Sequence, residues 1–215
     1  MPYSINSIQE LAGLLEMARY YAAILVLSNS LSTVLDNYVD DPATLIMEDP
    51  CAALEVAYEL RHPALFKDAF IAVLGPFHNP RFIDYPFEPE LKKLIQSKYD
   101  KFNSNFLQIQ QWALNDMIRA DDGSFDTLSS ALSHRVDESI EKFGRISYPY
   151  VCRKLYDIDL EDDRMALDMM LPVMCNHLIL DHSHRKSGEG HCCHYFLSTK
   201  LENSELPWDM NQRDW

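Results

Sequence analysis

The sequence predicts an all-α protein, an irregular multi-helix bundle in two packed lobes with little or no sheet. Apolar residues recur at three- and four-residue spacing along most of the 215 residues, which is the pattern of amphipathic helices. No segment alternates well enough for a sheet, although Tyr195-Phe-Leu197 fits a single short strand. Hydrophobic residues make up 47% and charged residues 24%, so the chain can bury a sizeable core.

Local signals mark where the first helices begin and end. Ser7-Ile-Gln-Glu10 is a capping box, and a second apolar stripe from Ala23 onward runs until Asp40-Asp-Pro42. Two further helices begin at Asp49-Pro50 and His62-Pro63, because proline fits the first helical position. Gly75-Pro76 should stop the second of these, with the glycine in a left-handed conformation.

A proline-rich stretch predicts the boundary between the two lobes. Residues 76–89 carry four prolines, and we place a hinge at residues 79–89 between an N-terminal lobe at 1–78 and a C-terminal lobe at 90–200. The second lobe should contain a long amphipathic helix from Leu91 to Met117, another from Phe125 to Ile140, and shorter helices after Tyr148 and Asp159. Residues 201–215 should form a docked tail.

Composition excludes several classes of function. The chain has 33 acidic and 19 basic residues, a formal charge of −14, so we expect no binding to nucleic acid. Six scattered glycines supply no phosphate-binding loop, and the common catalytic motifs do not occur. The apolar run from Tyr20 to Leu27 is too short for a membrane span, and the N-terminus lacks a basic leader. Five cysteines with one adjacent pair make a poor disulfide framework, which favours a cytoplasmic or nuclear location.

Histidine and cysteine concentrate in residues 175–194. This window holds eight of the chain's 13 histidines and cysteines, and zinc prefers such ligands as two close pairs across a loop. The candidate metal ligands are His182, His184, His191, Cys192 and His194. Their spacing matches no established zinc finger, so the alternative is a polar histidine-rich loop, with no cofactor as the simpler expectation.

Other reactive side chains have simpler structural explanations. Cys152 could act as a nucleophile, but its apolar helix favours a buried thiol. Asp159, Asp162 and Asp163 could bind magnesium, but acidic residues at a helix start usually cap it. The methionines of residues 165–174 could line a groove or fill the core.

Two tryptophans in the tail are the candidate partner-binding residues. Trp208 and Trp215 lie in an otherwise polar segment, and tryptophan often dominates the energy of protein interfaces. Docking of both rings onto the body of the protein is an equally good interpretation.

The segment Ala57-Tyr-Glu-Leu-Arg-His-Pro through Gly75 resembles the helical region that follows the BTB/POZ domain in fungal BTB-domain proteins. Residues 11–31 and the closing Leu206-Pro-Trp-Asp209 and Asp214-Trp215 are similar to the same group. The resemblance covers residues 8–78 and, more loosely, the tail. It implies an all-helical, BACK-like interaction module, either cut after a BTB domain or standing alone.

These observations predict a non-enzymatic protein–protein interaction module that recognises a substrate or scaffold partner. They do not predict how many copies of the chain assemble. Two alternatives remain: a small helical enzyme using the cluster from Cys175 to His194, or a structural zinc module pinned by the same residues.

Overall fold

The computed structural model describes residues 7–39, 41–77, 80–119, 124–157 and 170–210. These residues form α-helices, short 3₁₀ turns and irregular segments, with no strand among them, which confirms the predicted all-α class. The helices are α1 (Ile8–Tyr20), α2 (Ile24–Tyr38), α3 (Pro42–Glu48), α4 (Pro50–Glu59), α5 (Pro63–Leu74), α6 (Pro89–Arg119), α7 (Ser124–Phe143) and α8 (Tyr148–Tyr156). Residues 170–174 are also helical.

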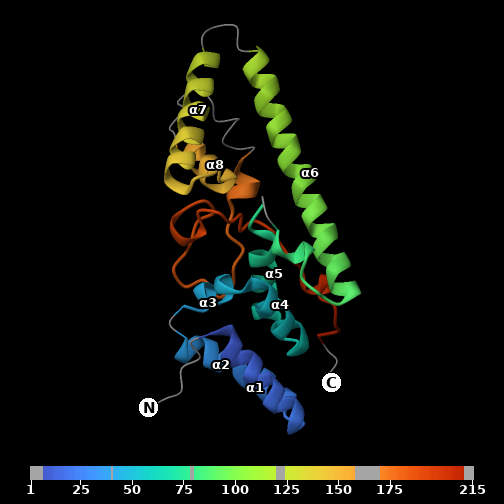
Figure 1. Ribbon diagram of the computed structural model, residues 1–215. Helices are drawn as coiled ribbons and strands as arrows, with labels where there is room; N and C mark the ends of the chain where they lie inside the picture. Colours follow the sequence, from blue (N-terminus) through green and yellow to red (C-terminus); the bar gives the residue numbers. More distant parts are fainter. Residues whose placement is uncertain (1–6, 40, 78–79, 120–123, 158–169, 211–215) are drawn as a thin grey trace.

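The helices divide the molecule into a compact end and a long hairpin. Figure 1 shows α1 and α2 at one end of the molecule, α3, α4 and α5 at its centre, and α6 and α7 extending together to the opposite end. Helix α4 packs against both α1 and α5, and α8 packs against α7. The irregular C-terminal segment, orange to red in Figure 1, runs between the central helices and α8.

Helix starts follow the predicted caps. The Ser7 hydroxyl accepts a hydrogen bond from the Glu10 amide at 3.2 Å, and the Asp49 carboxylate accepts one from the Ala52 amide at 3.3 Å. At the start of α5, the His62 ring nitrogen Nδ1 accepts the Leu65 amide at 3.2 Å, and Nε2 lies 2.8 Å from the Ser32 hydroxyl. Since Nδ1 accepts, Nε2 carries the proton and donates to Ser32.

Gly75 ends α5 as predicted, but the predicted left-handed conformation is wrong. Its φ is −57° and its ψ is −42°, an ordinary right-handed helical conformation. Glycine is needed here because the C-terminal segment comes very close. A Cβ atom at this position would lie 2.5 Å from the Tyr195 ring and 3.2 Å from the Phe196 carbonyl oxygen.

The largest hydrophobic core joins the N-terminal helices to segments that are distant in sequence. Its buried side chains come from α1 to α5, and also include Leu91 and Ile95 of α6 and Leu180, Leu201 and Leu206 of the C-terminal segment. The predicted hinge contributes to this core, because Phe82 and Phe87 are both buried in it. The described part of the predicted hinge, residues 80–89, therefore packs against the first lobe, and residues 201–208 of the tail do so as well.

A second cluster, made mostly of aromatic rings, connects α6 to α8 and the C-terminal segment. The Phe77 ring lies 4.8 Å from Phe106 and 6.0 Å from Phe196, measured between centroids. Cys152 is buried in the same cluster, as its apolar helix predicts, and burial raises the pKa of its thiol to about 12. The high pKa keeps this thiol protonated at neutral pH.

Tyr195-Phe-Leu197 does not form the predicted strand, because its backbone bonds go to three different segments. The Phe196 amide donates to the Gly75 carbonyl at 3.1 Å, and the Leu197 amide donates to the Ser187 hydroxyl at 2.9 Å. The Leu197 carbonyl accepts the His177 amide at 3.0 Å. These backbone groups are thus satisfied without a ladder.

Asp68 of α5 anchors the C-terminal segment from within the core. Its fully buried carboxylate accepts the amides of Ile179 and Leu180 at 2.8 and 2.7 Å. Burial raises the pKa of Asp68 to about 6, against the lowering effect of these two hydrogen bonds. Nearby Asp181 raises it further.

Arg185 fixes the same segment to the start of α3. Its guanidinium donates to Asp181 at 2.6 Å, to the Thr44 hydroxyl at 2.7 Å, and to Asp41. Asp181 also accepts bonds from Asn176 and Ser183. Although burial opposes it, these hydrogen bonds lower the pKa of Asp181, so the buried carboxylate stays charged.

Candidate functional site

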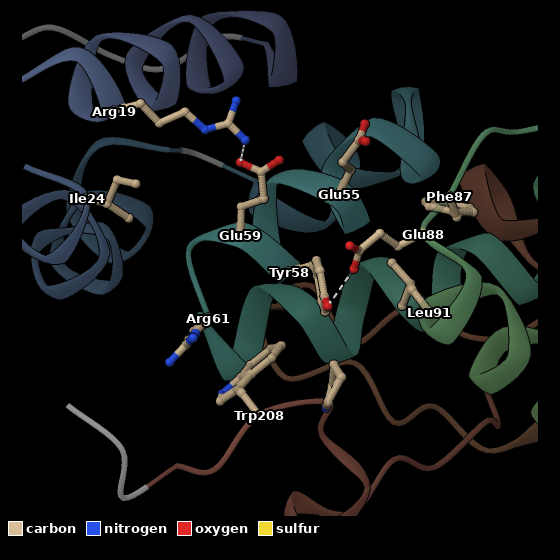
Figure 2. A pocket seen from close by; sticks show the side chains of 11 residues that line it. Arg19, Ile24, Glu55, Tyr58, Glu59, Arg61, Phe87, Glu88, Leu91 and Trp208 are labelled. Carbon is tan, nitrogen blue, oxygen red and sulfur yellow. Dashed lines mark hydrogen bonds and ion pairs between the residues drawn. The ribbon is translucent and has the colours of Figure 1, made fainter. Parts of the chain in front are cut away.

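A pocket of about 420 Å³ lies where α1, α4, the start of α6 and the C-terminal segment meet. Its size falls within the range of ligand-binding cavities. The lining combines three carboxylates, two guanidinium groups, three aromatic rings and three aliphatic side chains: Glu55, Glu59, Glu88, Arg19, Arg61, Tyr58, Phe87, Trp208, Ile24, Leu91 and Pro207. Figure 2 shows these side chains around the pocket.

Trp208 forms one wall of the pocket and is held by contacts within the chain. Its ring packs edge-on against Phe66, with centroids 4.9 Å apart, and lies 6.3 Å from the Tyr58 ring. Buried Leu206 and Leu201 hold the preceding backbone, and Glu205 pairs with Lys98 at 2.5 Å. The docking interpretation of Trp208 is therefore correct, and its half-buried ring still lines the pocket. Trp215 lies outside the described residues.

Two tyrosines fix two of the pocket's carboxylates. The Tyr58 hydroxyl donates to Glu88 at 2.8 Å, a contact drawn in Figure 2, and the Tyr85 hydroxyl donates to Glu55 at 2.9 Å. Burial and these bonds raise the pKa of both tyrosines, so both remain proton donors at neutral pH. Glu55 and Glu88 are themselves exposed to solvent.

The third carboxylate is paired with an arginine at the other side of the pocket. Arg19 of α1 bridges Glu59 of α4 and Glu16 of its own helix, the latter at 2.6 Å. Figure 2 shows this pair apart from the Tyr58–Glu88 contact, and shows the Arg61 side chain directed away from Glu88. The pocket thus has one charge-paired side and one side where carboxylates meet aromatic rings.

Exposed apolar side chains continue from the Arg19 side of the pocket. Tyr20 is 83% exposed and Tyr21 is 70% exposed, although both are large and partly apolar. They belong to a group around the α1–α2 turn that also contains Leu14, Met17, Leu25 and Val26. We call this group the α1–α2 apolar surface. Tyr20 and Tyr21 lie between Arg19 and Ile24 in sequence, and both of these flanking residues line the pocket, so the tyrosine end of the surface adjoins the pocket.

The five predicted metal ligands are placed in different environments. His182, His184 and His191 are exposed, whereas Cys192 is fully buried beside Met47, with 3.7 Å between the sulfur atoms. His194 packs edge-on against Phe143 at 4.7 Å. Burial lowers the pKa of His194 and raises that of Cys192 to about 12. Within the described ranges, no three histidine, cysteine or acidic side chains gather closely enough to hold a metal ion. The zinc and enzyme hypotheses remain predictions.

The remaining candidates are less informative. Asp159, Asp162 and Asp163 lie outside the described residues. Of the methionines in residues 165–174, Met165 and Met169 lie outside the described residues. Met174 is buried and Met170 half-buried against the second cluster, which agrees with core filling. All five cysteines are free thiols. Among the helices that the structure describes, none is both long enough and apolar enough to cross a bilayer.

Sequence reasoning missed the acidic residues of the pocket. Glu55 and Glu59 are four residues apart on α4, a spacing that places them on one helix face. Nothing local relates them to Glu88 or Trp208, which reach the site through the tertiary fold. Only the tryptophan carried a signal of its own.

No protein-family model matches this chain, and neither a curated protein nor a solved structure matches it. The resemblance to the helical region after the BTB domain therefore stays a prediction.

Proposed function

We propose that this chain is a non-enzymatic protein-interaction module, which binds a partner segment in the pocket beside Trp208 and over the α1–α2 apolar surface. The observation that carries the proposal is the continuity of these two features. A preformed pocket with aromatic walls adjoins a group of large, solvent-exposed apolar side chains. Protein interfaces combine such aromatic anchors with polar groups around them.

The cost of exposing these side chains supports the proposal. A turn between two helices needs no apolar residues, and each exposed ring contacts water that a partner would displace. Tyr20 and Tyr21 lie with their ring centroids 5.0 Å apart at the α1–α2 turn, the part of the molecule farthest from the α6–α7 tip in Figure 1. A partner covering the turn and the pocket would bury both features together.

The predicted kinship with BTB-associated helical regions agrees with this function. The segments that carry the resemblance, residues 8–78 and the tail through Trp208, contribute to one hydrophobic core in this chain. We propose accordingly that the chain is a BACK-like module of a substrate adaptor or scaffold, acting in the cytoplasm or nucleus, where its five thiols would stay reduced.

Quantitative affinity capture with matched variants tests this function. Glu88→Lys places a positive charge in the pocket, Tyr20→Ala removes an exposed ring, and Glu141→Lys makes the same charge change on the exposed face of α7. We expect wild type and Glu141→Lys to capture the same protein. A purified complex of that protein should then show a dissociation constant raised about tenfold or more by the two other changes.

All three substitutions are at exposed side chains, and the hydrogen bond that they remove is the one from Tyr58 to Glu88, so thermal melts should stay close to that of the wild type. Failure to enrich any protein reproducibly would contradict the proposal. An enriched protein that binds all three variants equally would also contradict it, because its docking site would then lie elsewhere.

A further inference from the structure

We infer that the pocket beside Trp208 takes an arginine side chain from a basic segment of the partner protein. This inference rests on the proposed function, and it specifies the chemistry that the pocket recognises. The partner's guanidinium would lie against the Tyr58 ring and donate to the Glu88 carboxylate, with Trp208 and Glu55 lining the pocket on either side of this pair.

The two carboxylates are held in place by uncharged donors. Each uses its Oε2 atom to accept from a neutral tyrosine hydroxyl, at 2.8 Å for Glu88 and 2.9 Å for Glu55. Among the described residues, neither glutamate forms an ion pair. The tyrosines thus orient the two charges without neutralising them, which is the preparation that a cationic ligand needs.

The aromatic walls of the pocket suit a planar cation better than a compact one. Trp208 and Tyr58 supply aromatic faces, and Phe87 lines the pocket beside Glu88. A guanidinium stacks on such rings while its N–H groups fork toward carboxylates, whereas a lysine ammonium is a more strongly hydrated point charge. The arrangement therefore favours arginine over lysine.

Figure 2 shows neither of the pocket's own arginines joined to Glu88, although the charge of Arg61 is close enough to lower the pKa of Tyr58 slightly against burial. Arg19 is occupied by Glu16 and Glu59, and Figure 2 shows it on the opposite side from Glu88. The Arg61 side chain points away from the Tyr58–Glu88 pair in the same view. Three glutamates against two arginines leave an acidic excess in the lining, and the chain's formal charge of −14 would attract a basic segment over longer distances.

Three nine-residue peptides that differ only at the central position test the inference. They carry arginine, citrulline or lysine there, flanked by alanine and leucine, with glycine and serine at both ends. Citrulline keeps the shape and the planar head of arginine but removes its charge. Binding is followed through the Trp208 indole N–H signal of the full chain by NMR, assigned with a Trp208→Phe variant.

We expect a saturable shift with the arginine peptide and binding about tenfold weaker with citrulline, because charge-assisted bonds are lost. The lysine peptide should fall between them. The double variant Glu55→Gln/Glu88→Gln should remove most of the preference for arginine over citrulline, and raising the salt concentration should weaken only the charged peptides. The matched control Glu138→Gln/Glu141→Gln on α7 should behave as the wild type.

The outcomes separate this inference from the function on which it rests. Equal binding of arginine and citrulline peptides, or no saturable shift with any of them, would overturn the arginine assignment. If the captured partner loses affinity for Glu88→Lys but binds Glu55→Gln/Glu88→Gln as tightly as the wild type, the result would support the proposed interaction module and contradict recognition of an arginine. If no partner depends on the pocket, the proposed function fails first.

Discussion

The indole ring of Trp208 stands nearly perpendicular to the ring of Phe66, at an angle of 80° with the centroids 4.9 Å apart. Phe66 is fully buried in α5, so this contact ties the C-terminal segment to the centre of the main core. The same indole lines the candidate pocket. One side chain therefore both holds the tail in place and shapes the site.

Removing this ring should loosen the tail. Trp208→Ala loses a half-buried aromatic contact, and we expect the free energy of unfolding to fall by about 2 kcal/mol. Tryptic cleavage after Lys200 in the native protein should become faster, because the segment would detach more often. Trp208→Phe keeps a ring and is the matched control, with a smaller loss. Equal cleavage rates in wild type and Trp208→Ala would contradict the docking role.

The buried carboxyl of Asp68 should make stability depend on pH in an unusual direction. Its pKa rises from 3.8 to about 6 on folding, so the folded protein binds more protons than the unfolded chain between these values. The contribution of Asp68 to the free energy of unfolding is therefore greatest below pH 3.8, the pKa in the unfolded chain. It falls by at most about 3 kcal/mol as the pH rises through about 6.

Asp68→Asn isolates that effect, because asparagine does not titrate. Its amide nitrogen would face a backbone N–H, which costs about 1–3 kcal/mol. Chemical denaturation of both proteins between pH 4 and pH 7 gives the comparison. The difference in free energy of unfolding between wild type and Asp68→Asn should become less favourable to the wild type as the pH rises. A difference that instead grows in its favour would show that the hydrogen bonds from the two amides lower the pKa of Asp68 more than burial raises it.

His62 should have the opposite pH dependence. Burial lowers the pKa of its imidazole below 6.5, so below that pH the unfolded chain binds more protons. The contribution of His62 is therefore complete above pH 6.5 and is lost as the pH falls. Protonation also removes the lone pair with which Nδ1 caps α5.

His62→Asn keeps a capping side chain but does not titrate. We expect the free energy of unfolding of the wild type, relative to that of His62→Asn, to fall by about 1 kcal/mol between pH 7.5 and pH 5. Urea denaturation of the two proteins at both pH values measures it. A constant difference would mean that His62 has its ordinary pKa in the folded protein.

Arg185 should be among the most sensitive positions outside the core. Arg185→Met would leave the Asp181 carboxylate, whose side chain is 1% exposed, without its cation. We expect a loss of about 3 kcal/mol in urea denaturation. Arg185→Lys keeps the charge but loses the forked bonds to Asp41 and Thr44, so its loss should be smaller. A loss below about 0.5 kcal/mol for Arg185→Met would show that this network contributes little.

The helices could be predicted from sequence where a local pattern specifies them. Ser7, Asp49 and His62 cap their helices through neighbours three residues away, and such contacts depend on nothing distant. Helix α3 was missed, although Asp41-Pro42 repeats the cap-and-proline pattern of Asp49-Pro50. Its seven residues are too few to display a clear apolar period.

The irregular C-terminal segment could not be predicted in this way, because its shape depends on distant partners. Asp68 is 111 positions from the amide of Ile179 that it binds. Buried Arg153 donates to the carbonyls of Ser187 and Met174 across 34 and 21 positions. The predicted metal ligands are close in sequence and all lie among the described residues, but their side chains do not lie close together in the structure. The segment exposes His182 and His191 but buries Cys192, so its histidine and cysteine side chains diverge.

The pocket illustrates the same limit. Tyr58 and Glu88 are 30 positions apart, and Tyr85 and Glu55 are also 30 apart, yet each pair forms a hydrogen bond. No periodicity relates such residues, and the tail that closes the pocket comes from the opposite end of the chain. Trp208 was found by residue type alone, because a tryptophan in a polar tail must be either docked or available to a partner.

Intermolecular nuclear Overhauser effects between the arginine peptide and the isotope-labelled chain test the central claim most directly. We expect contacts from the Cδ protons of the central arginine to the ring protons of Trp208 and Tyr58, and their loss with the citrulline peptide at the same concentration. Contacts confined to the α6–α7 hairpin, or contacts to Trp208 that persist unchanged with citrulline, would contradict recognition of an arginine in this pocket.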